Sequence, residues 1–252
     1  MMSLVLRKEL LELRRSPVLL LSMASLPATV VAVPVALLAW LVRVAPEQAL
    51  LFAQDIYGLR AADPALGVAM VLARNWLPMF LVLPIFLPIL LAAQSIGGER
   101  ERRTLEPLLA TPVRTLSIIL GKSLAALVPA LGITWIAAAL FCAGIDVVVG
   151  KPLLPDAAWL FGTLLLAPLL ALFGNATAVV VSARVLDPRA AQNLAATTVL
   201  PLLGLLVVQL AGRIALGPRF YFALAAGVAV ADVALIFVAV KLFDRERLLT
   251  RQ

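Results

Sequence analysis

The chain contains no histidine and a single cysteine, and these two scarcities exclude several kinds of site. Without histidine there is no His-ligated metal centre, no Ser–His or Cys–His nucleophile pair and no imidazole proton shuttle. Cys142 has no second cysteine with which to form an internal disulfide. The sequence therefore gives little support to an enzyme.

Charged residues are also scarce, at 14% of the 252 residues, whereas 63% are hydrophobic. Because about a quarter of the residues in a soluble domain are charged, this composition excludes a soluble globular protein. Uncharged runs cover residues 16–42, 75–98, 123–145, 157–183 and 190–212, and a sixth apolar run, 220–240, contains only Asp232. A helix of about 20 residues crosses the hydrocarbon core of a membrane.

We therefore predict an all-α integral membrane protein, a single domain over residues 1–252 with six transmembrane helices. Their approximate spans are 17–42, 75–98, 118–143, 157–183, 191–212 and 220–241. The first apolar run is too long for a signal-peptide core and no Ala-x-Ala-like site follows it, so we expect the first span to remain in the mature protein.

The positions of the basic residues predict the orientation of these spans. Six spans place both termini on one side of the membrane, and most lysines and arginines fall on that side, within 7–15, 100–122, 184–189 and 241–251. By the positive-inside rule this side is cytoplasmic. The formal net charge of +7 thus indicates membrane orientation and not a nucleic-acid partner.

Residues 3–15 predict a short amphipathic helix in the membrane interface, because Leu6, Leu10 and Leu13 recur at helical spacing among charged residues. The alternative is a basic flank that only fixes the topology. On the opposite side, the segment 43–74 is the longest external connection, with room for one or two short amphipathic helices.

Prolines and small residues predict local features of three spans. Pro78, Pro84 and Pro88 each remove a backbone donor, so we expect the second span to bend. Ladders of small residues four apart favour close approach of another helix. These ladders comprise Ala126, Ala130, Thr134, Ala138 and Cys142 in the third span, and Ala223, Gly227 and Ala231 in the sixth.

Asp232 lies about 13 residues, or roughly 20 Å, from the outer end of the sixth span, which is deep in the bilayer. An ionised carboxylate is costly there, so Asp232 must face protein or water, or be protonated. One interpretation is a functional acid that couples transport or contacts a substrate. The other is a structural hydrogen bond to a neighbouring helix, for which the candidate partners are Asn175, Thr177, Thr197 and Gln209.

Residues 98–112, GERERRTLEPLLATP, form a charged loop between the second and third spans. Pro107 would interrupt a continuous helix, but it fits the first turn of a new helix that is N-capped by Thr104. We therefore predict that the second span extends to about Arg103 and that a short helix follows from Leu105 to Ala110. The charge and the apolar residues of this loop are equally compatible with a docking element for a cytoplasmic partner and with a charged connector that only joins two spans.

The triplet Gly121-Lys122-Ser123 resembles the end of a nucleotide-binding P-loop, but Leu116 stands where that pattern needs its first glycine. A P-loop also follows a strand, whereas this triplet opens a predicted membrane helix. The sequence therefore predicts no nucleotide site in this chain.

The loop 99–113, ERERRTLEPLLATPV, followed by Gly121-Lys122, resembles the membrane subunits of type-2 ATP-binding-cassette (ABC) exporters. Members of that family have a loop of the form E-R-E-x-G-T-L-E-x-L-L-x-T-P-V, and Arg103 departs from its usual glycine. The segments 184–192, RVLDPRAAQ, and 243–249, FDRERLL, are similar to the family's second cytoplasmic loop and its tail. The resemblance therefore covers nearly the whole chain.

The resemblance implies a permease subunit in a bacterial inner membrane, with both termini cytoplasmic, that forms the translocation path of an exporter. Its first loop would hold a coupling helix that fits a groove of a separate ATPase. Two ATPase copies would bind ATP and Mg, with no cofactor in this chain, and a second permease copy, identical or related, would complete the membrane part. The implied ATPase contacts are Glu99, Glu101, Arg102, Thr104, Leu105, Glu106, Pro107, Leu108 and Leu109, with Arg184, Asp187 and Arg189 in the second loop.

A different hypothesis is a secondary transporter or channel that works without ATP and uses Asp232 as its ion-coupling residue. The sequence shows no internal repeat of the kind that many secondary transporters have. No motif in the sequence selects a transported substrate.

Overall fold

The structure is a computed structural model that describes residues 7, 11, 17–44, 47, 64–101, 115–182, 184–185, 187–210 and 216–249. Within these residues every element is helical. Six helical segments are long and apolar enough to cross a membrane: Leu21–Val44, Leu66–Ala92, Leu120–Val149, Ala157–Ser182, Arg189–Gln209 and Pro218–Ala239. The predicted all-α membrane fold with six spans is thus confirmed. Of the predicted interfacial helix over 3–15, only Arg7 and Leu11 are described.

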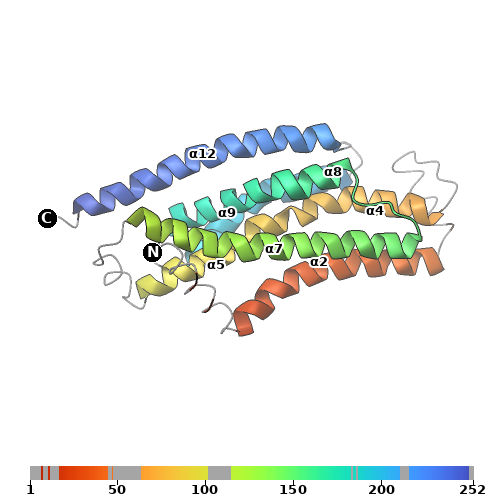
Figure 1. Ribbon diagram of the computed structural model, residues 1–252, viewed down its shortest axis with the longest axis horizontal. Helices are drawn as coiled ribbons and strands as arrows, with labels where there is room; N and C mark the ends of the chain where they lie inside the picture. Colours follow the sequence, from red (N-terminus) through yellow and green to blue (C-terminus); the bar gives the residue numbers. More distant parts are fainter. Residues whose placement is uncertain are drawn as a thin grey trace.

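The helices form one elongated bundle (Figure 1). Three spans are single helices, α2 (Pro17–Val44), α7 (Thr115–Val149) and α12 (Pro218–Leu249). The second span consists of α4 (Pro64–Phe80) and α5 (Val82–Glu101). The fourth consists of α8 (Ala157–Leu160), a π-helical segment η1 (Phe161–Leu166) and α9 (Ala167–Ser182). The fifth consists of α10 (Pro188–Ala196), a 3₁₀ turn η2 (Thr197–Val199) and α11 (Leu200–Leu210).

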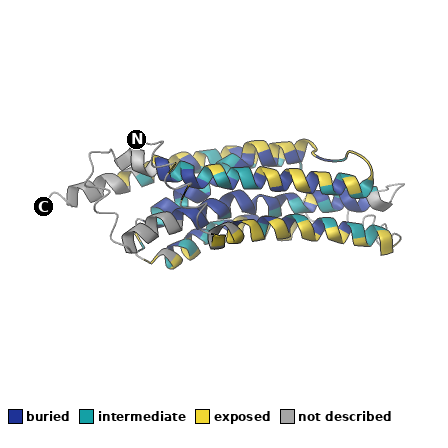
Figure 2. Ribbon diagram, turned by 60° about the horizontal axis from the view of Figure 1, so that its bottom comes forward, coloured by how far each residue is buried: buried dark blue, intermediate teal, exposed yellow. Residues whose placement is uncertain are grey.

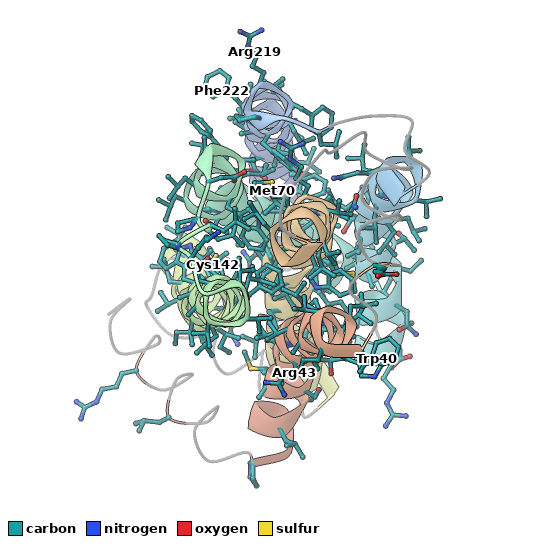
Figure 3. The ribbon with its side chains drawn as sticks, turned by 90° about the vertical axis from the view of Figure 1, so that its right-hand side faces the viewer. Trp40, Arg43, Met70, Cys142, Arg219 and Phe222 are labelled. Atoms are coloured by element: carbon teal, nitrogen blue, oxygen red, sulfur yellow. The ribbon has the colours of Figure 1, made fainter. Side chains whose placement is uncertain are left out.

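The second span occupies the centre of the bundle and is the most buried of the six. Viewed end-on, α4 is surrounded by the other spans (Figure 3). Its two halves have different neighbours, since α4 packs mainly against α2 and α11 whereas α5 packs mainly against α9, α7 and α10. The least buried span is α12, and the outward sides of the bundle are largely exposed (Figure 2).

Helix α4 begins at Pro64 and its membrane-capable part at Leu66, both earlier than the predicted start of the span at residue 75. Arg74 therefore lies within the membrane-capable helix Leu66–Ala92, whereas the prediction placed residues 43–74 outside the membrane. The prediction began the span at residue 75 because the predicted runs contained no charged residue, and residue 74 is an arginine. The Arg74 side chain is exposed, and a long basic side chain within a span can extend along the helix toward the polar interface.

The two predicted ladders of small residues differ in their surroundings. The ladder in α7 is buried from Ala126 to Cys142, which confirms its close packing. The ladder in α12 faces outward, because Ala223 and Gly227 are exposed and a Cβ added at Gly227 would meet no atom within 4 Å. Spacing alone does not say which face of a helix is covered.

Candidate functional site

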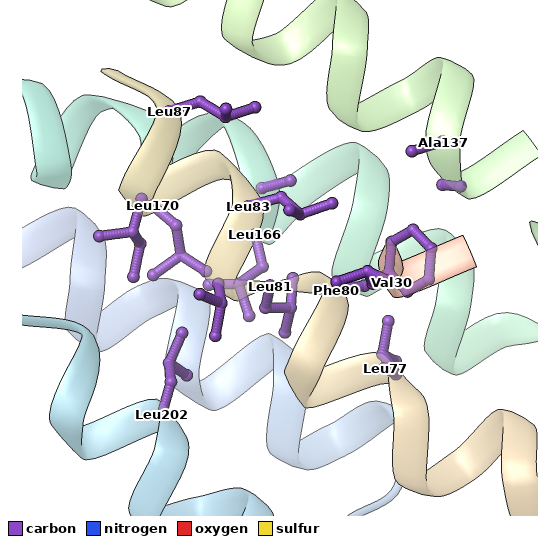
Figure 4. Close-up of a cluster of buried hydrophobic side chains, with 14 of the residues drawn as sticks. Val30, Leu77, Phe80, Leu81, Leu83, Leu87, Ala137, Leu166, Leu170 and Leu202 are labelled. Carbon is purple, nitrogen blue, oxygen red and sulfur yellow. The ribbon is translucent and has the colours of Figure 1, made fainter. Parts of the chain in front are cut away.

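The second span is interrupted at Leu81, where α4 ends and α5 begins. The Leu81 N–H still donates to the Leu77 carbonyl at 3.1 Å, but Pro84 has no N–H to offer the carbonyl of Phe80. The interruption thus lies among the prolines that were predicted to bend this span. Leu77, Leu81 and Leu83 are fully buried, in one cluster with Leu166 and Leu170 of the fourth span (Figure 4).

Three side-chain donors connect α4 to other spans through backbone carbonyls. The indole Nε1 of Trp76, on α4 itself, donates to the Val30 carbonyl of α2 at 2.8 Å. In the reverse direction, Gln209 Nε2 of α11 donates to the Arg74 carbonyl at 2.7 Å. Trp159 Nε1 of α8 donates to the adjacent Ala73 carbonyl at 3.2 Å. Residues 73–76 therefore join four spans.

Two of these acceptors lie four residues before a proline. Val30 precedes Pro34, and Arg74 precedes Pro78, so neither carbonyl has its usual helical donor. An unpaired backbone carbonyl is costly in hydrocarbon, and a donor from a neighbouring helix removes that cost. The prolines were visible in the sequence, but the donors were not, because they come from other spans.

A third carbonyl without a helical donor lies in the π-helical segment η1. There the Ala167 N–H donates to Gly162, and Pro168 has no N–H for the next carbonyl in that register, Thr163. Trp135 Nε1 of α7 donates to this Thr163 carbonyl at 2.9 Å. The same pairing of a proline-freed carbonyl with a side-chain donor thus occurs in the second, fourth and first spans.

We expect Gln209→Leu to destabilise the bundle by about 1 kcal/mol, because the Arg74 carbonyl loses its donor. In a Pro78→Ala background, the new N–H at residue 78 is available to that carbonyl, so the same substitution should cost about half as much. A double-mutant cycle of unfolding in detergent measures the difference. Equal costs of Gln209→Leu in both backgrounds would contradict the pairing.

Three aromatic rings fasten the break in the second span to its neighbours. The centroid of Trp159 lies 4.9 Å from Phe141 of α7, with the rings stacked at 17°, and 5.1 Å from Phe80 at the end of α4. All three side chains are at most 2% exposed. Such contacts add to area burial, so they hold α4, α7 and α8 in one packed unit.

Beyond the break, α5 lies in close contact with α9. Gly174 of α9 faces the backbone of Ile85, with no room between them for a side chain. A glycine at a helix crossing permits this approach of two backbones. The second span is therefore held mainly by different helices on either side of Leu81, and α5 runs from the packed centre to Glu101.

The residues implied as ATPase contacts lie mostly outside the described part of the chain. Glu99 and Glu101 belong to the last turn of α5, where the backbone is described. The others, Arg102, Thr104, Leu105, Glu106, Pro107, Leu108 and Leu109, and with them the short helix predicted after Thr104, lie outside the described residues. Their role stays a prediction.

The second loop leads into α10, the first helix of the fifth span, and α10 packs against α5 and α9. The Asp187 carboxylate N-caps α10 and accepts hydrogen bonds from the backbone N–H groups of Arg189 and Ala190, both at 3.1 Å. The following Pro188 suits the first helical position. This Asp-Pro signal marks the start of α10. Arg184 and Arg189 are exposed.

Asp232 is buried on α12, at 2% exposure. Neither of its carboxyl oxygens has a hydrogen-bond partner in the described part of the chain. The predicted partners Thr177 and Thr197 donate instead to carbonyls of their own helices. Gln209 donates to Arg74, and the Asn175 Oδ1 is also unpaired. Within the residues that the structure describes, Asp232 therefore lacks the hydrogen bond that its structural interpretation required.

The triplet Gly121-Lys122-Ser123 lies inside α7, several residues after its start. Backbone N–H groups in a helix interior are bonded to the preceding turn and do not point at a phosphate. The geometry of this triplet differs from that of a P-loop, as its sequence context predicted.

Comparison with known proteins gives one family. The family described as "ABC-2 family transporter protein" matches residues 3–240 of the chain. No curated protein matches it. The match spans all six membrane-capable helices and the two loops that follow α5 and α9.

Proposed function

The chain belongs to the ABC-2 family of transporter proteins, a family of membrane permease subunits, and we infer that it works as an exporter driven by a separate ATPase. ATP and Mg would bind to that ATPase and not to this chain. Membership in this family favours ATP-driven transport over the alternative of a secondary transporter.

The observation that supports this proposal most is the course of the second span. From Leu81 at the packed centre, α5 runs as one helix to Glu101 and leads directly into the charged loop 102–114. Helix α10 of the second loop packs against α5 at the same end of the bundle. A push on the loop would therefore be transmitted along α5 to the break at Leu81.

The charge distribution supports a cytoplasmic position for this end. The start of α7 and the ends of α5, α9 and α12 lie at one end of the bundle (Figure 1), and the sequence is rich in lysine and arginine around these helix ends, a pattern that the positive-inside rule associates with the cytoplasmic side. The complete transporter would contain two ATPase copies and a second permease copy in the inner membrane of a bacterium. The ATPase contacts would be residues 99–109 in the first loop and Arg184, Asp187 and Arg189 in the second.

Charge reversal in the first loop tests the docking. We expect Glu101→Lys with Glu106→Lys to reduce co-purification of the co-expressed ATPase at least about tenfold, since repulsion and lost pairing at a docking surface cost on the order of 1–2 kcal/mol. The measurement is the ratio of ATPase to permease in the purified complex.

The matched control is Glu47→Lys. Glu47 is an exposed acid three residues after Val44, the last residue of α2, and is not part of either loop proposed to contact the ATPase. This variant should retain the wild-type ATPase ratio. If the loop variant keeps that ratio and its ATP hydrolysis stays coupled to the membrane part, the proposed docking through the first loop is wrong.

A further inference from the structure

Helix α12 turns one acidic side chain into the bundle. Its buried residues among those described are Tyr221, Ala225 and Asp232, which recur at helical spacing and so form one inward stripe. Asp232 lies within the span Pro218–Ala239. Its carboxyl group therefore faces neighbouring helices inside the membrane and not lipid or water.

The helices around this stripe offer no charge to balance a carboxylate. Helix α12 packs mainly against α9, η1 and α8 (Figure 1), and residues 157–182, which form them, contain no titratable side chain. On α12 itself the nearest cations are Lys241 and Arg219, about 14 Å and 20 Å away along the axis. Tyr221, the other titratable group of the stripe, is about 16 Å away.

The hydrogen-bonding of the seam between α12 and α9 is also incomplete. Both carboxyl oxygens of Asp232 and the Asn175 Oδ1 of α9 are buried without a hydrogen-bond partner in the described part of the chain, and so is the Tyr221 hydroxyl near the start of α12. Burying a carboxylate with neither a counter-charge nor a donor is far more costly than burying a neutral carboxyl. The environment therefore selects the protonated form, whose O–H is a donor, whereas the Asn175 Oδ1 of α9 is a buried acceptor without a partner in the described residues.

We propose that Asp232 is a proton-binding site of this permease. While α12 is packed on α9, the carboxyl holds a proton. When the seam admits water, the O–H bond breaks, the proton passes to water and the carboxylate remains. The site depends on the packing of α12 and not on ATPase docking, so it extends the proposed function without resting on it.

An apolar carbodiimide tests the protonation state directly, because it reacts with a protonated carboxyl and enters the membrane. The full-length permease in liposomes is treated at neutral pH, and modification is quantified on peptides by mass spectrometry. We expect several-fold more modification at Asp232 than at Asp146 or Asp156, whose carboxylates accept backbone N–H bonds near the membrane surface. Modification should fall as the pH is raised.

Infrared spectroscopy of the same liposomes gives a readout that does not need reagent access. The carboxylic-acid C=O band at neutral pH should disappear in Asp232→Asn and persist in the control Glu47→Gln, an exposed acid. Asp232→Asn, a neutral side chain of similar shape, should also keep the wild-type unfolding temperature. An unchanged band in Asp232→Asn, or loss of folded protein in that variant alone, would overturn the proposal.

Discussion

Replacing Gly174 by valine is expected to cost the bundle about 3 kcal/mol or more of stability, because the helix crossing at its centre has no space for a side chain. A Cβ at this position would fall on the Ile85 carbonyl oxygen, nearer than Cβ atoms approach in real structures, and within 3.1 Å of the Ile85 Cα and carbonyl carbon. These are backbone atoms, which cannot rotate away as a side chain can. The two helices would have to separate.

The separation would affect α5 and α9, the helices with the most extensive contact among those that the structure describes. For a chain of this size, 3 kcal/mol corresponds to a fall of about 6–12 °C in the unfolding temperature. The measurement is the thermal unfolding of purified protein in detergent, together with the fraction that elutes as a single species.

Gly227→Val is the matched control, since the same substitution on α12 meets no atom within 4 Å. It should leave the unfolding temperature nearly unchanged. Equal behaviour of the two valine variants would show that the α5–α9 crossing is wider than described.

Trp159→Ala is expected to destabilise the bundle by about 3–5 kcal/mol, the range for removal of a large buried aromatic side chain. The substitution removes the ring stacked on Phe141, the contact with Phe80 and the donor to Ala73. Because α4, α7 and α8 meet at these rings, the cavity would lie where three spans depend on one another. Denaturant or thermal unfolding in detergent measures the loss.

Two further variants separate ring packing from hydrogen bonding. Trp159→Phe keeps an aromatic ring but loses the indole N–H, so it should cost about 1–2 kcal/mol. Trp40→Ala removes a tryptophan that is 56% exposed and should have little effect. If Trp159→Ala costs no more than Trp40→Ala, the aromatic cluster is not what joins these spans.

The number and type of the spans could be predicted because length and absence of charge are sufficient to recognise a membrane helix. The interruption of the second span at Leu81 lies among the prolines that predicted an irregular helix there. The start of that span did not follow, since an exposed Arg74 inside a helix looks like the end of an apolar run. Similarly, the outward position of Gly227 depends on which face of α12 meets α9, and the sequence of α12 has small residues on more than one face.

For the candidate site, the sequence could locate the groups that needed partners but not the partners. Pro34 and Pro78 mark the carbonyls of Val30 and Arg74 as acceptors without a donor. The donors Trp76 and Gln209 are set by packing between spans, which no local pattern encodes. Asp232 was recognisable as a buried acid, and only the structure shows that the neighbouring helices leave it unpaired.

The side-chain donors to carbonyls that lack a helical N–H because of a proline also determine when, during synthesis, each of these carbonyls can be hydrogen-bonded. Trp76, the donor to the Val30 carbonyl, is synthesised 46 residues after Val30. Trp135, the donor to the Thr163 carbonyl, is synthesised before Thr163. Gln209, the donor to the Arg74 carbonyl, is synthesised 135 residues after Arg74. The central span therefore enters the membrane with an unmet polar group, and only insertion of the fifth span supplies its donor.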